Sequence, residues 1–175
     1  MANDVSYDYR DYTATGEKAE LDFIKAVKAK NIDVVVVKAT EEQDMFQHWD
    51  YSFDGVTIDI KSRRNIGILN ANGDKYTVLE LVNRNGDKGW LFGDAQYIAF
   101  EFTTNVLDAF LVIPRIELVK YHEAHTQDII VNDMNDCIHK KYSNTICEFV
   151  LTGVPLEEIQ KLSGTKLIKK ANDTV

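Results

Sequence analysis

Two aspartates and a lysine around an Asp-Gly pair are the residues of this chain best suited to chemistry. Asp50 precedes the pair Asp54-Gly55, and Asp59 and Lys61 follow it. An Asp-Gly pair between two alternating runs predicts a two-residue β-hairpin turn. In that register Asp50 lies directly across from Asp59, with the Cβ atoms roughly 5 Å apart. Lys61 shares their face because side chains alternate along a strand.

Like charges directly opposite each other destabilise a hairpin, so something should offset the repulsion between the two carboxylates. A divalent cation between them would do so, and Lys61 would do so in part. Hard oxygen ligands suit Mg²⁺ or Mn²⁺, ions that keep water molecules and also bind substrate phosphates. The hairpin therefore predicts a Mg²⁺ or Mn²⁺ site with Asp50 and Asp59 as ligands.

The order of these residues, Asp50, eight further residues and then Asp59-Ile60-Lys61, resembles the PD-(D/E)xK superfamily of metal-dependent nucleases. In that family an acidic residue opens one strand of a hairpin, and the (D/E)xK triplet lies on the partner strand. The resemblance covers 15–64. It implies a restriction-endonuclease-like core, and it makes the backbone carbonyl of Ile60 a further metal ligand. It also implies that Lys61 orients or helps to deprotonate the attacking water and neutralises charge that develops on the phosphate.

In the same family a glutamate from the preceding helix often completes the site. The candidate here is Glu20, because it lies one helical turn before Ile24 and two before Val27 and so should face the sheet. Glu17 is the alternative ligand. The structural interpretation of Glu20, a carboxylate at the rim of the core or a partner within the helix, remains open from the sequence.

Two further residues are candidates for a supporting role. Glu80 lies inside the apolar run 78–82, where a lone charge is costly to bury. It is either an exposed or salt-bridged strand residue, or a site residue that binds a metal through water or pairs with Lys61 or Arg63. The hairpin register also places His48 across from Lys61, where it would contact the scissile phosphate or cap the strand.

The net charge of −8 argues against broad nonspecific binding of nucleic acid, which depends on Lys and Arg that neutralise phosphates. Basic residues nevertheless cluster at 61–64, 140–141 and 166–170. The first cluster extends the strand of the candidate site, so we expect Arg63 and Arg64 to bind nucleic acid. The other two are interpreted as solvated surface.

Hydrophobic periodicity predicts individual helices and strands, and the resemblance implies that they form an α/β fold with a mixed central β-sheet flanked by helices. The chain is expected to be a single nuclease-like domain over 1–175, with an arm at 1–13 and a frayed tail at 171–175. Helices are predicted at 15–30, 115–124 and 155–162, a buried strand at 33–38, the hairpin at 47–61, and further strands at 76–83, 96–102, 109–113 and 146–151.

One feature departs from the family pattern. The family usually places a helix after the (D/E)xK strand, whereas 65–93 is typical of loops and strands, so a short helix near 93–97 is expected to serve instead. The run 80–100 resembles small phage-type nuclease-like proteins.

Composition also limits the class of protein to which this chain can belong. Apolar content of 45% and charged content of 27% are ordinary for a globular protein, and no run of 18 apolar residues predicts a membrane span. The acidic N-terminus does not resemble a signal peptide. The two cysteines, Cys137 and Cys147, lack metal-binding spacing and are expected to be reduced thiols in a cytoplasmic protein.

The sequence thus predicts a Mg²⁺-dependent nuclease that hydrolyses phosphodiester bonds, with DNA as the expected nucleic-acid partner. On this hypothesis Lys61→Ala removes activity and leaves folding nearly intact. The alternative is a noncatalytic accessory factor on a nuclease-like fold that binds nucleic acid or protein. A third interpretation is a hairpin whose acidic side chains simply face solvent. The repulsive pair Asp50 and Asp59 favours the enzyme, because a binding module does not need it.

Overall fold

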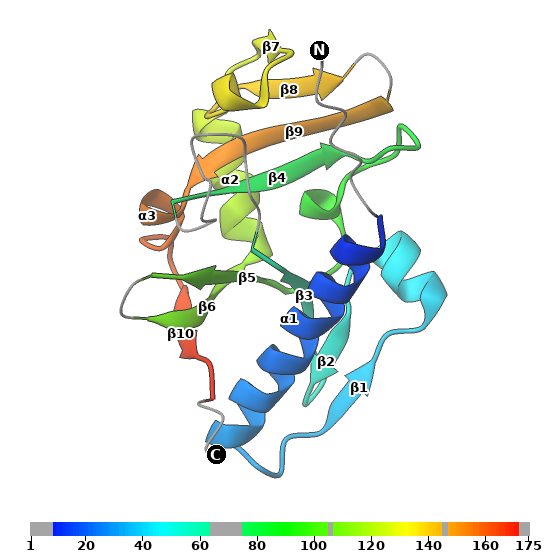
Figure 1. The fold of residues 1–175 in the computed structure, drawn as a ribbon, viewed down its shortest axis with the longest axis vertical. Helices are drawn as coiled ribbons and strands as arrows, with labels where there is room; N and C mark the ends of the chain where they lie inside the picture. The colour runs from blue at the N-terminus through cyan, green and yellow to red at the C-terminus, as the bar shows by residue number, and fades with distance from the viewer. Residues whose placement is uncertain (1–8, 64–74, 105–106, 145–146, 172–175) are drawn as a thin grey trace.

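A computed structural model describes residues 9–63, 75–104, 107–144 and 147–171. They form a mixed α/β fold with two β-sheets and few helices. Figure 1 shows the four-stranded sheet above the six-stranded sheet, with helix α2 beside them. The sequence predicted one central sheet, and the second sheet is the main difference from that prediction.

Helix α1 (Tyr9–Lys30) packs against one face of the six-stranded sheet. Its buried side is centred on Phe23, whose ring meets the rings of Phe53 and Phe110 edge-on at 5.4 and 5.0 Å between centroids. Edge-to-face contacts of this kind add to the energy of apolar burial. The helix ends at Lys30 as predicted but begins at Tyr9, so 9–13 belong to α1 and not to an arm.

The predicted hairpin is confirmed in position and register. Strand β2 (Tyr51–Phe53) pairs with β3 (Val56–Lys61), and Phe53 lies opposite Val56. The two turn residues, Asp54 and Gly55, have φ angles of 49° and 83°. Positive φ at both central residues is the requirement of a type I′ turn, and it explains why an Asp-Gly pair specifies this hairpin.

The six-stranded sheet has the order β1-β2-β3-β5-β6-β10. Strand β5 runs parallel to β3, and the other pairs are antiparallel. The strands not yet given bounds are β1 (Val36–Lys38), β5 (Tyr97–Thr103), β6 (Asp108–Pro114) and β10 (Lys166–Lys169). The expectation of a buried strand over 33–38 is wrong, because β1 is a short edge strand and Val35 and Val37 are exposed. Strand β10 lies in a basic segment that we interpreted only as solvated surface.

The four-stranded sheet has the order β4-β9-β8-β7. Its strands are β4 (Tyr76–Val82), β9 (Cys147–Pro155), β8 (Lys141–Asn144) and β7 (Ile130–Val131). The largest apolar core joins its strands β4 and β9 to β5, β6 and α2 (Arg115–His125). The remaining helical segments are η1 (Gln43–Gln47), η2 (Trp90–Phe92), η3 (Met134–Asp136) and α3 (Leu156–Ile159).

Two predicted helices differ in the structure. The short helix expected near 93–97 is absent from that segment, and the 3-10 helix η2 comes earlier, at Trp90–Phe92. The helix predicted at 155–162 is shortened to α3. Among the helices that the structure describes, none combines the length and the apolar character required to cross a membrane.

Candidate active site

Asp50 ends the strand pairing at the open end of the hairpin. Its backbone N–H donates to the carbonyl of Ile58 at 3.0 Å, and its carbonyl accepts from the N–H of Ala39 at 2.8 Å. Its carboxylate Oδ2 accepts a hydrogen bond from the backbone N–H of Ile60 at 2.6 Å. The Asp50 side chain thus satisfies a strand donor just beyond the last paired residue, which fixes the carboxylate beside β3.

Asp59 is buried, with only 2% of its surface exposed. Its neighbours Ile58 and Ile60 belong to the apolar cluster under α1. Since side chains alternate along a strand, Asp59 faces the other side of the sheet, where Lys61 meets the ring of Trp90. The polar face that the sequence predicted therefore exists, but the layer that contains the second sheet covers it.

Lys61 lies directly beside Asp59. Its Nζ is 2.8 Å from Asp59 Oδ1 and 5.0 Å from the centre of the Trp90 ring. Burial alone would lower the pKa of Lys61, but the charges of Asp59 and Asp50 outweigh this effect, and the pKa is raised. The ammonium is therefore the stable form in this site without a metal ion.

The carboxyl groups of Asp50 and Asp59 are coupled. Burial, followed by the charge of Asp59, raises the pKa of Asp50 to about 7. Burial also raises the pKa of Asp59, although Lys61 and a hydrogen bond with Asp50 act in the opposite direction. Asp59 Oδ2 has no hydrogen-bond donor unless Asp50 carries a proton. Two buried acidic groups whose charges interact are expected to titrate as a pair.

Glu20 lies on the α1 side of the same end of the hairpin. It is half-buried and hydrogen-bonds to Tyr51, and burial, followed by the charge of Asp50, raises its pKa. The prediction that Glu20 faces the sheet is thus consistent with its position. Glu17 is exposed. No three His, Cys, Asp or Glu side chains within the described residues are grouped so that they could hold a metal ion, so Glu20 does not complete a three-residue set.

Trp90 is a site residue that the sequence reasoning missed. Glu80, which is partly buried, accepts a hydrogen bond at 3.4 Å from the Trp90 backbone N–H, and its charge favours the ammonium form of Lys61. Gly89 makes this approach possible, since a Cβ there would lie 2.3 Å from the backbone oxygen of Glu80. The signal available in the sequence was the pair Gly89-Trp90, which directly follows the turn-forming residues 85–88. Glu80 of β4 and Trp90 of η2 thus support Lys61.

His48 does not take the position that the hairpin register gave it. It caps the π-helix η1 with a left-handed backbone, φ 54°, and its N–H donates to the carbonyl of Asp44 at 3.2 Å. The prediction that His48 pairs across from Lys61 is therefore wrong, because β2 does not extend back beyond Tyr51. The π-helix interrupts the extended chain that the prediction assumed.

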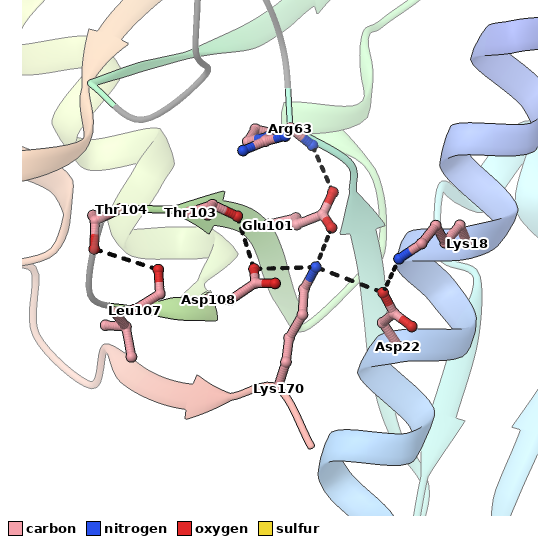
Figure 2. Close-up of polar contacts among 9 residues, drawn as sticks. All are labelled: Lys18, Asp22, Arg63, Glu101, Thr103, Thr104, Leu107, Asp108 and Lys170. Carbon is pink, nitrogen blue, oxygen red and sulfur yellow. Dashed lines mark hydrogen bonds and ion pairs between the residues drawn. The ribbon is translucent and has the colours of Figure 1, made fainter. Parts of the chain in front are cut away.

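Arg63 lies just past the end of β3. Its backbone N–H donates to Glu101 Oε2 at 3.0 Å, and Figure 2 shows its side chain beside the end of β5. Arg64 lies outside the described residues. The structure thus brings Asp50, Asp59 and Lys61 together and sets Arg63 next to them along the chain.

No known protein family, curated protein or solved structure matches this chain. The function of the site is therefore inferred from the geometry of its residues.

Proposed function

We propose that this chain is a nuclease that uses Mg²⁺ or Mn²⁺ to hydrolyse phosphodiester bonds in nucleic acid, with DNA as the expected substrate. The observation that supports this function is a coupled pair of carboxyl groups, Asp50 and Asp59, with a lysine ammonium 2.8 Å from one of them. A structural ion pair needs one acid for one base. The second, repulsive acid is explained if a cation binds there.

The residues present fit such an ion. Asp59 Oδ2 is buried without a donor and is free to be a ligand, and Asp50 lies next to it. The N–H and C=O of one strand residue point to the same side, so the Ile60 carbonyl lies on the side of the Asp50 carboxylate that its N–H contacts. Mg²⁺ needs only one or two protein carboxylates, because water and substrate phosphate supply its other ligands.

When bound, the ion would activate a water molecule and polarise the phosphate. Lys61 would donate hydrogen bonds to the phosphate oxygens and stabilise the negative charge that develops there. Its raised pKa favours this electrostatic role over that of a base. Trp90 and Glu80 would hold the ammonium in place, and Glu20 would act through water from the α1 side.

The topology supports a restriction-endonuclease-like core. Helix α1 precedes the hairpin and covers one face of its sheet, and β5 follows β3 as a parallel neighbour. The described part of the connection between β3 and β5 contains β4 and the 3-10 helix η2 in place of an α-helix. This connection differs from the usual family pattern, and it carries Trp90 and Glu80 to the site.

One observation favours the noncatalytic accessory factor as a second candidate. The ion pair between Lys61 and Asp59 already compensates the buried charge, and no third acidic ligand joins the pair among the described residues. An accessory factor on this fold would bind nucleic acid or a protein without an ion at the hairpin.

The test combines metal binding with cleavage. Mn²⁺ binding is measured by calorimetry, and cleavage of labelled DNA and RNA is measured in single turnover with Mg²⁺. Wild type should bind and cleave, whereas Asp59→Asn should do neither. Asp33→Asn, which removes an exposed acid far from the hairpin end, is the matched control and should behave as wild type. Equal Mn²⁺ binding by wild type and Asp59→Asn would refute the metal site, and the absence of both Mn²⁺ binding and cleavage of any substrate by wild type would favour the accessory factor.

A further inference from the structure

A cleft lies beyond the carboxyl ends of the two parallel strands β3 and β5, beside α1. Its volume is about 430 Å³, within the range of small-ligand sites. Figure 2 shows the side chains that surround it. The lining residues come from α1, β5, β6 and the segments that follow β3 and β10, and they are Thr15, Lys18, Arg63, Glu101, Thr103, Asp108 and Lys170.

Most charges at this cleft are already paired. Lys170 Nζ lies 2.5 Å from Glu101 Oε1, 3.2 Å from Asp108 Oδ1 and 3.6 Å from Asp22 Oδ2. Lys18, whose side chain is 70% exposed, contacts Asp22 at 2.6 Å. The network joins α1 to three strands of the sheet, so it holds the walls of the cleft at a fixed separation.

Arg63 is the exception. Its guanidinium makes no ion pair or hydrogen bond with another described residue, and Figure 2 draws none from it to the residues shown there. Its backbone is nevertheless fixed, because its N–H donates to Glu101 Oε2 while the other oxygen of Glu101 binds Lys170. Among the described residues, the cleft thus presents one positioned cation without a counter-charge, beside Lys18, which contacts Asp22 but remains exposed.

Asp108 supplies a different group on the opposite side of the cleft. Its Oδ1 accepts a hydrogen bond from the hydroxyl of Thr103 at 2.8 Å and contacts Lys170. Its Oδ2 has no such donor among the described residues, and the side chain is 50% exposed. A lining with a spare cation and a spare acceptor suits a ligand with an anionic group and a hydrogen-bond donor.

We propose that this cleft holds one nucleotide of a single strand of nucleic acid, with its phosphate on Arg63 and Lys18 and its base edge on Asp108. The volume is sufficient for one nucleotide. Carboxylates accept hydrogen bonds from the exocyclic amino group of cytosine.

This inference rests on the proposed nuclease and specifies its substrate as nucleic acid with an unpaired strand or end. Asp108 would also give a preference for cytosine over thymine, because thymine has no exocyclic amino group.

The test is fluorescence anisotropy with a short labelled single strand, its blunt-ended duplex and a nucleoside monophosphate, with Ca²⁺ in place of Mg²⁺. Arg63→Ala and Lys18→Ala should each weaken single-strand binding by about threefold to tenfold and reduce the slope of log K against log salt by about 0.7, as expected for one phosphate contact on a single strand. Arg84→Ala, which removes an exposed arginine from a distant turn, is the control and should change neither. Wild type should bind oligodeoxycytidylate more tightly than oligodeoxythymidylate, and Asp108→Asn should lose that preference.

The outcomes separate the cleft from the nuclease. Single-strand binding that depends on Arg63 and Lys18, in a protein that cleaves nothing, would support the cleft and refute the nuclease. Metal-dependent cleavage with binding unchanged in both variants would refute the cleft alone. Tighter binding of the duplex, affinity for the monophosphate equal to that for the strand, or equal affinity for the two homopolymers would also overturn the proposal.

Discussion

Asp50 and Asp59 lie in a more buried environment than the hairpin pattern in the sequence indicates. The sequence predicted that they face each other, because an Asp-Gly turn fixes the register of the two strands. It did not predict that Asp59 is buried, because burial of that face depends on β4 and η2, which come from a later part of the chain. Burial therefore raises the pKa of both carboxyl groups, which would not happen to two surface acids.

Protonation of Asp50 should make the metal-free protein more stable at low pH. The pKa of Asp50 is raised to about 7 in the folded protein from 3.8, so its contribution is fully present below pH 3.8 and is lost as pH rises through 7. Asp50→Asn resembles the protonated form and should remove this dependence. In EDTA the variant should gain on the order of 3 kcal/mol relative to wild type between pH 4 and pH 8.

Urea unfolding of both proteins at a series of pH values measures this difference. Asp33→Asn serves as the control, since that residue is exposed. Parallel pH profiles for wild type and Asp50→Asn would show that the two carboxyl groups do not share a proton.

Lys61 should be important for folding as well as for chemistry. The sequence suggested that Lys61→Ala would leave the fold nearly intact, but the ammonium pairs with a carboxylate that is only 2% exposed. Removal of one partner of a buried ion pair typically costs about 3–5 kcal/mol. Lys61→Ala should therefore be strongly destabilised at pH 8, and the double variant Lys61→Met/Asp59→Asn should recover much of the loss. A melting temperature of Lys61→Ala equal to that of wild type would contradict the burial of the pair.

At the scale of elements, features determined by neighbouring residues were predicted better than features determined by contacts between distant parts of the chain. The end of α1 at Lys30, the hairpin and the order β5, β6 and α2 follow from periodicity and turn residues that act within a few positions. Strand β1 was predicted as buried because 34–37 is a run of valines, but its place at the sheet edge depends on which strand pairs with β2. The position of Trp90 depends on a close contact between Gly89 and β4 that only the fold reveals.

Two glycines should respond to alanine in opposite directions. A Cβ at Gly89 would lie 2.3 Å from the backbone oxygen of Glu80, so Gly89→Ala must displace η2 and the Trp90 ring. Overpacking of this kind costs about 1–3 kcal/mol. Gly16 lies within α1 with nothing within 4 Å of a Cβ, so Gly16→Ala should stabilise by about 0.5–1 kcal/mol.

Thermal unfolding measures both glycine effects, and Trp fluorescence should change only in Gly89→Ala. If the cleavage reaction exists, Gly89→Ala should also slow it, because Lys61 would lose the ring that supports its ammonium. Destabilisation by Gly16→Ala would contradict the prediction for α1. An unchanged stability of Gly89→Ala would contradict the close contact between Gly89 and Glu80.

At the scale of the whole molecule, the candidate ion site lies where the two sheets meet. Asp59 belongs to the six-stranded sheet, and Trp90 and Glu80, which support Lys61, belong to the connection through the four-stranded sheet. Local patterns in the sequence do not predict this arrangement, because the pairing of β4 with β9 joins segments about seventy residues apart. An ion bound at this position would stabilise both layers together and not a local loop.

Mn²⁺ should therefore raise the temperature of a single cooperative unfolding transition. An ion at about 100 times its dissociation constant stabilises the folded state by about 2.7 kcal/mol, which for a chain of this size corresponds to roughly 5–10 °C. The gain should be larger at pH 8 than at pH 5.5, because Asp50, with a pKa of about 7, must lose its proton before it can bind the ion. Calorimetric scans of wild type, Asp59→Asn and the control Asp33→Asn at both pH values measure this dependence. The gain should be absent in Asp59→Asn and retained in the control, and a gain that is the same at both pH values, or that persists in Asp59→Asn, would place the ion elsewhere in the protein.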